Sequence, residues 1–229
     1  MPLLTNFIEH SSDKAIFAVN DPRQVMEQHE LSPTEVLNLC GGIPLPDIGD
    51  IQVKISSQYQ GALSVEIKTD QYELIRLMDF DIGRLDNQIM VVASSARGQG
   101  IGTNLFLNQV QAAQRRRFKK LRTIARAPST YEDGDVNWQG HYFWANLGFE
   151  NIEHAEFKEW ALARHRHEST LSELVQSEEG RQLWKDQGFT WIGEFVLDLR
   201  WCLTLIAQHK GFILRIHSFN SFNTRIYKQ

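Results

Sequence analysis

The stretch "VVASSARGQGIGTNLF", residues 91–106, runs from β-branched residues through three closely spaced glycines into a helical pattern. Glycine inside a helix costs about 1 kcal/mol relative to alanine, so Gly98, Gly100 and Gly102 must meet a requirement other than helix stability. The first turn of a helix exposes unpaired N–H groups and a partial positive charge, and a turn without side chains lets phosphate oxygens approach them. The stretch therefore predicts a strand, a phosphate-binding turn and a helix.

Two common phosphate-binding motifs do not fit this stretch. The dinucleotide fingerprint G-x-G-x-x-G requires a glycine where Thr103 stands, and the P-loop pattern G-x-x-x-x-G-K-[ST] is absent from the sequence. The pattern R-x-x-G-x-G does fit, as "RGQGIG" over residues 97–102. A tight glycine turn without a ligand is the alternative interpretation.

The surrounding pattern predicts an α/β fold with a mixed sheet. Alternation indicates strands in "IQVKISSQYQGALSVEIKT" (51–69, a hairpin), "YELIRLMDF" (72–80), "NQIMVVAS" (87–94) and "LRTIARA" (121–127). Helical spacing from Ile101 to Ala113 indicates an amphipathic helix between the last two strands. This βαβ unit predicts locally parallel strands, with antiparallel hairpins before them.

A second segment supports one family resemblance. Asn137 precedes an aromatic helix that contains Trp144 and ends in the sequence L-G-F, residues 147–149. Together with the R-x-x-G-x-G stretch, it resembles the GNAT superfamily of N-acetyltransferases. The resemblance implies a central mixed sheet flanked by helices, with a core over about 50–150.

The same resemblance implies that acetyl-CoA is the cofactor. Its diphosphate would bind the glycine turn, and its pantetheine arm would lie between two parallel strands that splay at a bulge near Val91 and Val92. The residues implied in cofactor binding are Val91, Val92, Arg97, Gly98, Gln99, Gly100, Ile101, Gly102, Thr103, Asn137 and Trp144.

The residues implied in catalysis are less well defined. Attack by an amine benefits from a general base, and a backbone N–H of Val92 or a neighbour would stabilise the oxyanion. Many family members supply a tyrosine to protonate the leaving thiolate, but Trp144 stands at that position, and an indole N–H cannot act in the same way. The candidates that remain are Tyr131, Glu66 and His141, with Asp79 and Asp81 as further carboxylates.

For domain organisation, we expect residues 1–155 to form the acetyl-CoA-binding domain. Residues 156–229 then form a C-terminal extension packed on the same domain, helical over about 160–190 with a strand in "TWIGEFVLDL", 190–199. The resemblance says little about residues 1–45 or 160–229.

Composition narrows the classes of partner. The chain has 24 basic and 28 acidic residues and a net charge of −4, which disfavours a broad nucleic-acid-binding face. No apolar run reaches the roughly 18 residues of a membrane span, and Cys40 and Cys202 have no metal-ligand or CxxC spacing. We expect a cytoplasmic protein without a metal site, acting on a small-molecule or protein amine, and compatible with a homodimer.

Two other functions stay open on the sequence. Trp144 favours a catalytically impaired GNAT-like module that binds coenzyme A or a protein partner. Acetylation of aminoacyl-tRNA, as in toxin relatives, is the third hypothesis, although the acidic net charge argues against it.

Overall fold

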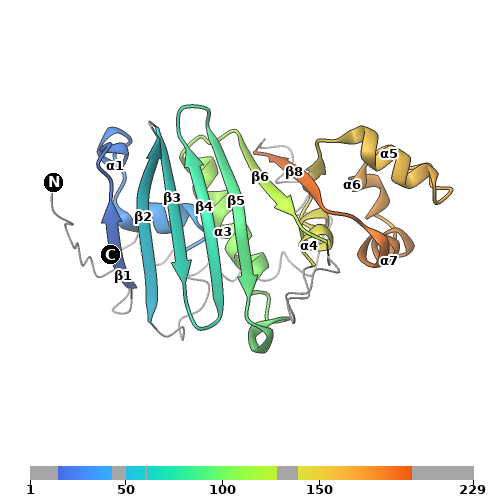
Figure 1. Ribbon diagram of the computed structural model, residues 1–229, viewed down its shortest axis with the longest axis horizontal. Coiled ribbons are helices and arrows are strands. Elements are labelled where there is room, and N and C mark those ends of the chain that lie inside the picture. Colours follow the sequence, from blue (N-terminus) through green and yellow to red (C-terminus); the bar gives the residue numbers. More distant parts are fainter. Residues whose placement is uncertain (1–14, 43–49, 60, 128–138, 198–229) are drawn as a thin grey trace, which may run out of the picture.

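The computed structural model describes residues 15–42, 50–59, 61–127 and 139–197. One eight-stranded sheet organises them, in the order β1-β2-β3-β4-β5-β6-β8-β7 (Figure 1). The strands are β1 (Ala15–Asn20), β2 (Ile51–Tyr59), β3 (Ala62–Lys68), β4 (Tyr72–Asp79), β5 (Arg84–Val92), β6 (Lys120–Ala125), β7 (Glu150–Asn151) and β8 (Trp191–Val196). The helices are α1 (Val25–Gln28), α2 (Pro33–Leu39), the 3₁₀ turn η1 (Ser94–Ala96), α3 (Ile101–Arg115), α4 (Gly140–Asn146), α5 (His154–Leu162), α6 (Leu171–Leu174) and α7 (Glu178–Gln187).

The strand directions confirm the expected mixed α/β fold. β2 to β5 form an antiparallel meander, as the predicted hairpin and strands require. β5 and β6 are parallel, and α3 connects them, which completes the predicted βαβ unit. β1 also pairs in parallel with β2, and β8 lies between β6 and β7 as an antiparallel partner of both.

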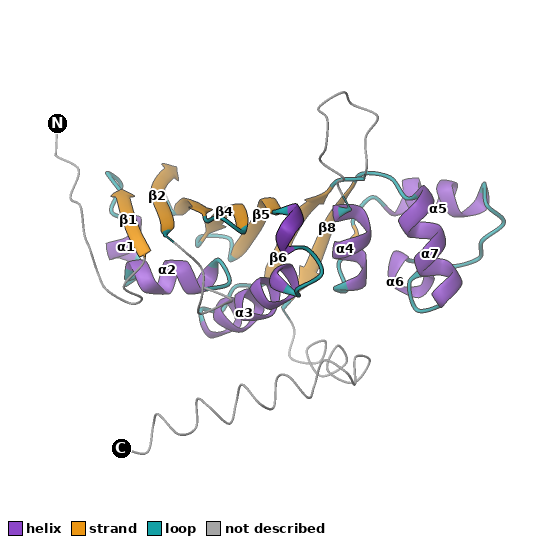
Figure 2. Cartoon of the chain, turned by 90° about the horizontal axis from the view of Figure 1, so that it is seen from below, coloured by secondary structure: helices purple, strands orange, loops and turns teal. Residues whose placement is uncertain are grey.

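Helices α2 and α3 lie together on one face of the sheet (Figure 2). Alternate residues of β4, namely Tyr72, Leu74 and Met78, are buried on the helix-covered side of the sheet. The chain after α2 packs so closely on α3 that a Cβ on Gly41 would collide with the backbone carbonyl of Leu105. In the described ranges, no helix covers the other face of β1 to β5 (Figure 2).

The C-terminal elements join the same sheet through β8. Trp184 on α7 and Trp191 on β8 are both almost fully buried, and their indole N–H groups both donate to the backbone carbonyl of His141 on α4. Trp201 and Cys202 lie outside the described residues, whereas Cys40 is a buried free thiol. Within the described part, the tryptophans therefore pack α4, α7 and β8 into one unit.

The bulge lies earlier in β5 than the expected position near Val91 and Val92. Ile75 pairs with Ile89 and Arg76 pairs with Asn87, so Gln88 is the extra residue on β5. Val91 and Val92 themselves pair regularly with β4. The family resemblance implied the position near Val91 and Val92, and the continuous apolar run "IMVV" gives no sign of where the two-residue period slips.

Candidate functional site

A gap opens in the sheet where β5 and β6 separate. The two strands pair only over Arg84–Asn87 and Lys120–Thr123. Beyond this point β5 continues beside β4, while Ile124 and Ala125 of β6 pair with β8. The bulge at Gln88 lies at this fork. A bulge bends its strand and increases the local twist, which accounts for the separation of β5 from β6. The fork is therefore a feature of the sheet itself.

The backbone of β5 presents hydrogen-bonding groups to this gap. Ala93 N–H donates at 2.8 Å to the carbonyl of Gln71, the residue just before β4. Because the N–H and C=O groups of alternate residues in a strand point to opposite sides, those of Val92 and Met90 face away from β4. The Val92 carbonyl accordingly accepts from Arg97 Nε at 3.1 Å. The edge of β5 thus presents the backbone groups of Met90 and the N–H of Val92 to the gap, while the Val92 carbonyl is occupied by Arg97.

The glycine turn leads from this edge into α3. Gly98 and Gly100 have φ angles of 77° and 79°, a left-handed conformation that favours glycine, and a Cβ on either would meet no atom within 4 Å. Gly100 is the N-cap of α3, and within the described residues no side chain caps this helix. The first N–H groups of a 15-residue helix therefore face an open turn.

Gly102 serves a different purpose. A Cβ there would lie 3.1 Å from Phe143 Cζ and 3.3 Å from Met90 Cε, so the glycine lets α3 pack closely on α4 and β5. Gln99, between the other two glycines, is exposed and donates from Nε2 to the Ser95 carbonyl at 3.2 Å. The glycine pattern thus combines a left-handed turn with one close contact.

Arg76 on β4 is a fully buried cation next to the fork. Its Nη1 donates to the Ile89 carbonyl at 3.2 Å, and its Nη2 lies 3.7 Å from Met90 Sδ. Burial lowers the pKa of Arg76 to about 10, which leaves the guanidinium charged at neutral pH. Burial of the neighbouring Cys40 raises the pKa of its thiol to about 12, and burial of Tyr72 raises the pKa of its hydroxyl. Sequence analysis did not single out this arginine, although the alternation in β4 places it at a core-facing position.

A buried polar cluster marks the base of the fork. Gln109 Nε2 of α3 donates to Asn87 Oδ1 at 2.8 Å, and the Thr123 hydroxyl donates to the Asn87 carbonyl at 3.2 Å. Among the described atoms, Asn87 Nδ2 and Gln109 Oε1 are buried and have no hydrogen-bond partner. Sequence analysis missed all three residues, although polar side chains at core-facing positions of "LDNQ" and "LNQV" were a visible signal.

On α4, His141 and Trp144 lie in the core. His141 Nε2 is 3.1 Å from the carbonyls of both Trp184 and Lys185, and since carbonyls only accept, this nitrogen carries the ring proton. Desolvation lowers the pKa of His141. Trp144 is 5% exposed and packs against Phe106 and Phe149. Both side chains therefore contribute to packing, and it is Phe143 that approaches Gly102 beside the gap.

The remaining candidate catalytic residues are dispersed. Glu66 on β3 pairs with Lys54 at 3.7 Å and is separated from β5 by the whole of β4. Asp79 and Asp81 lie at the turn before β5, at the opposite end of this strand from the glycine turn. Tyr131 and Asn137 lie outside the described residues.

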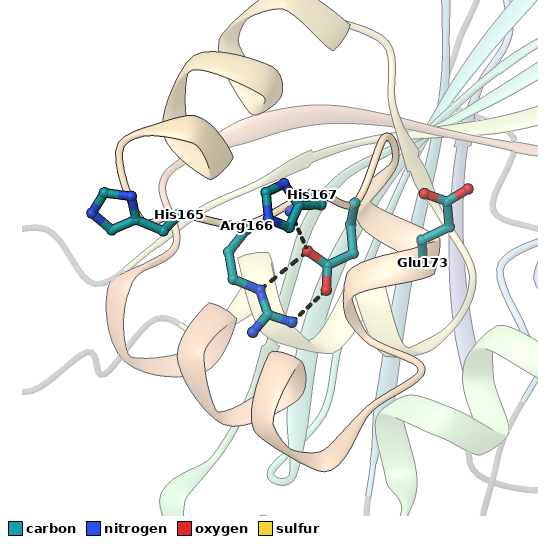
Figure 3. A pocket seen from close by; sticks show the side chains of 5 residues that line it. His165, Arg166, His167 and Glu173 are labelled. Carbon is teal, nitrogen blue, oxygen red and sulfur yellow. Dashed lines mark hydrogen bonds and ion pairs between the residues drawn. The ribbon is translucent and has the colours of Figure 1, made fainter.

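A hollow lies where α5 is followed by α6 along the chain. It is lined by His165, Arg166, His167, Glu168 and Glu173 (Figure 3). Arg166 forms ion pairs with Glu168 and, at 3.0 Å, with Glu179, so its charge is already compensated. Over the described ranges, no group of three or more His, Cys, Asp or Glu residues is arranged to hold a metal ion. None of the helices in these ranges has the length and apolar character needed to cross a bilayer.

No protein-family model matches the chain, and no curated protein matches it. Among solved structures, it has a similarity to the crystal structure of nourseothricin acetyltransferase. The two sequences are 16% identical, the aligned part covers 40% of this chain and 52% of that chain, and the TM-score is 0.30. The chain thus spans about half the length of that protein, and a likeness of this size carries no conclusion about activity.

Proposed function

We propose that this protein is an acetyl-CoA-dependent N-acetyltransferase that transfers the acetyl group directly to a primary amine. The observation that carries the proposal is the fork between β5 and β6, whose free strand edge leads straight into the uncapped N-terminus of α3. An extended chain with amide groups fits the strand edge of β5, and a diphosphate fits the N-terminus of α3. Coenzyme A joins these two chemistries in one molecule.

The residues present fit this cofactor. The N–H groups at the start of α3, from Ile101 to Thr103, would bind the diphosphate, and the turn at Gly98 and Gly100 leaves the space for it. Met90 and Val92 would bind the pantetheine amides as an added strand would. Arg97 would then release the Val92 carbonyl and move its guanidinium towards a phosphate.

The chemistry that the bound thioester supplies is an activated acetyl group. Met90 N–H, which faces the gap beside the bulge, would donate to an acyl carbonyl oxygen. Of the three candidate catalytic residues we retain Tyr131 as the proposed proton donor, because Glu66 is paired with Lys54 and His141 is buried. The acceptor is a small-molecule or protein amine, which must lose a proton before it attacks.

Calorimetry with acetyl-CoA, followed by a thiol-release assay over a panel of amines, tests the proposal. Micromolar binding together with amine-dependent thiol release is the expected result. Absence of binding of both acetyl-CoA and coenzyme A would contradict it. Native mass spectrometry of the purified protein provides an independent measurement, since a co-purified ligand would add the mass of coenzyme A.

A coenzyme-A-binding module without turnover is the second candidate. The burial of Trp144 and His141 favours it, because neither of these side chains then offers a proton to the gap. Binding of acetyl-CoA without thiol release for any amine in the panel would support this function over the first.

Further proposals concern partners and location. The net charge of −4 leads us to propose that nucleic acid is not a substrate, and a lack of salt-dependent RNA binding is the corresponding test. We also propose a cytoplasmic protein that can form a homodimer. Cell fractionation and sedimentation velocity measure these two properties.

A further inference from the structure

Arg76 is an unusual residue for a strand in the middle of a sheet. Its side chain is 0% exposed, and none of the described carboxylates neutralises its charge. Nε of the guanidinium is buried without a hydrogen-bond partner in the described part of the chain. Removing an ion from water is costly unless it is paired, so a role in stability alone is a poor explanation for this residue.

The guanidinium acts on a single peptide unit. Nη1 donates to the Ile89 carbonyl at 3.2 Å, immediately after the extra residue Gln88 of the bulge. The other end of this peptide is the Met90 N–H, which faces the gap. The Met90 side chain is also held, because its sulfur lies 3.7 Å from Arg76 Nη2 and its methyl group lies beside Gly102.

We propose that Arg76 is a positioning residue, which holds and polarises the Ile89–Met90 peptide so that the Met90 N–H is directed into the gap as the donor to an acyl carbonyl oxygen. A hydrogen bond to the carbonyl of an amide strengthens the N–H of the same amide as a donor. A buried cation has the largest such effect, because the surrounding dielectric constant is low. The inference rests on the proposed function and assigns the acyl-binding end of that site.

The test compares Arg76→Met, which removes the charge at similar volume, with Arg76→Lys, which keeps a cation. Tyr72→Phe is the matched control, because it removes a buried hydroxyl beside Arg76 that has no hydrogen-bond partner among the described residues, and it leaves the bond to Ile89. The first measurement needs no ligand. The Met90 amide resonance and its order parameter, from ¹⁵N relaxation, should change in Arg76→Met and stay unchanged in Tyr72→Phe.

The second measurement is the affinity ratio of acetyl-CoA to coenzyme A. In Arg76→Met the affinity for coenzyme A should stay within about twofold, while the preference for the acetylated form falls by roughly fivefold, the effect of one hydrogen bond. kcat should fall by tenfold or more, towards the roughly 100-fold effect of losing an oxyanion donor, with KM for the amine unchanged. Arg76→Lys should recover part of both losses.

The outcomes separate the two proposals. If wild-type protein binds no coenzyme A, the proposed function fails. If coenzyme A binds normally in every variant, and Arg76→Met leaves the Met90 resonance and the affinity ratio unchanged, only the role of Arg76 is overturned. If Arg76→Met does not fold, Arg76→Gln replaces it as the uncharged variant, and unchanged values of both measurements in Arg76→Gln would also overturn the inference.

Discussion

A carboxylate at position 103 is the sharpest probe of the anion site. Thr103 is the third residue of α3, so Thr103→Glu places a negative charge among the N–H groups proposed to bind the diphosphate. The charge complements the helix dipole, which stabilises the folded protein by about 0.3–1 kcal/mol. Substitution at the glycines is less informative, because Gly100 has a left-handed backbone and Gly102 contacts Phe143.

The magnitude follows from Coulomb's law. A carboxylate about 6 Å from a phosphate opposes its binding by ~3 kcal/mol at an effective dielectric constant of about 20. Since about 1.4 kcal/mol corresponds to a tenfold change in Kd, we expect coenzyme A to bind roughly 100-fold more weakly. Raising the salt concentration should reduce this difference through screening.

Thr103→Gln is the matched control, with equal size and no charge. Calorimetry should give a Kd for Thr103→Gln close to the wild-type value, and thermal melts should show Thr103→Glu to be at least as stable as wild type. Equal coenzyme A affinity in the Glu and Gln variants would refute the reasoning, because the added charge must repel a diphosphate bound at this helix terminus.

Three further predictions concern β5 and α4. Deleting Gln88, which is exposed, should straighten β5 and abolish coenzyme A binding in calorimetry while urea titration shows a stability change within about 1 kcal/mol; Gln88→Ala, which retains the bulge, is the control. Trp144→Tyr should destabilise the protein by about 1–3 kcal/mol without raising turnover in the thiol-release assay, since the ring lies in a packed cluster with Phe106. His141 has a lowered pKa, so the unfolded chain binds the extra proton and stability is lost as the pH falls below about 6.5. His141→Gln should reduce the stability difference between pH 7.5 and 5.5, and an undiminished difference would contradict this assignment.

Much of the sheet could be predicted from local patterns. The strand and helix around the glycine turn follow from the β-branched segment at 87–94 and the helical spacing from Ile101, and the structure has β5 and α3 there. The sequence explains only in part why glycines stand at three positions of this turn. Gly98 and Gly100 have the left-handed conformation expected of glycines in a turn. Gly102 instead leaves space for Phe143 and Met90, which are remote in sequence and become its neighbours only in the fold.

The roles of the residues around the fork could not be predicted, although the polar residues at core-facing positions were visible in the sequence, because these roles depend on contacts between distant strands. Arg76 stands in "YELIRLMDF", where an arginine in an alternating strand is normally assigned to the solvent face. Its position in the alternation, two residues from Leu74 and Met78, in fact places it in the core. His141 illustrates the converse, since a titratable side chain in an aromatic helix was a candidate catalyst and is instead held by two carbonyls of the α7 region.

The bulge allows β5 to keep its core-facing side chains in place while the strand separates from β6. Leu85 and Asn87 face the helices before it, and Met90 and Val92 face them after it, so Gln88 is inserted without moving any later side chain to the wrong face. A regular strand would satisfy the same core, but it could continue to pair with β6 and leave no gap. Removing the inserted residue would therefore leave the packing of the core unchanged. What the inserted residue changes is the direction of the strand at the point where a buried guanidinium holds the backbone, and this coincidence supports the proposal that the fork binds a ligand.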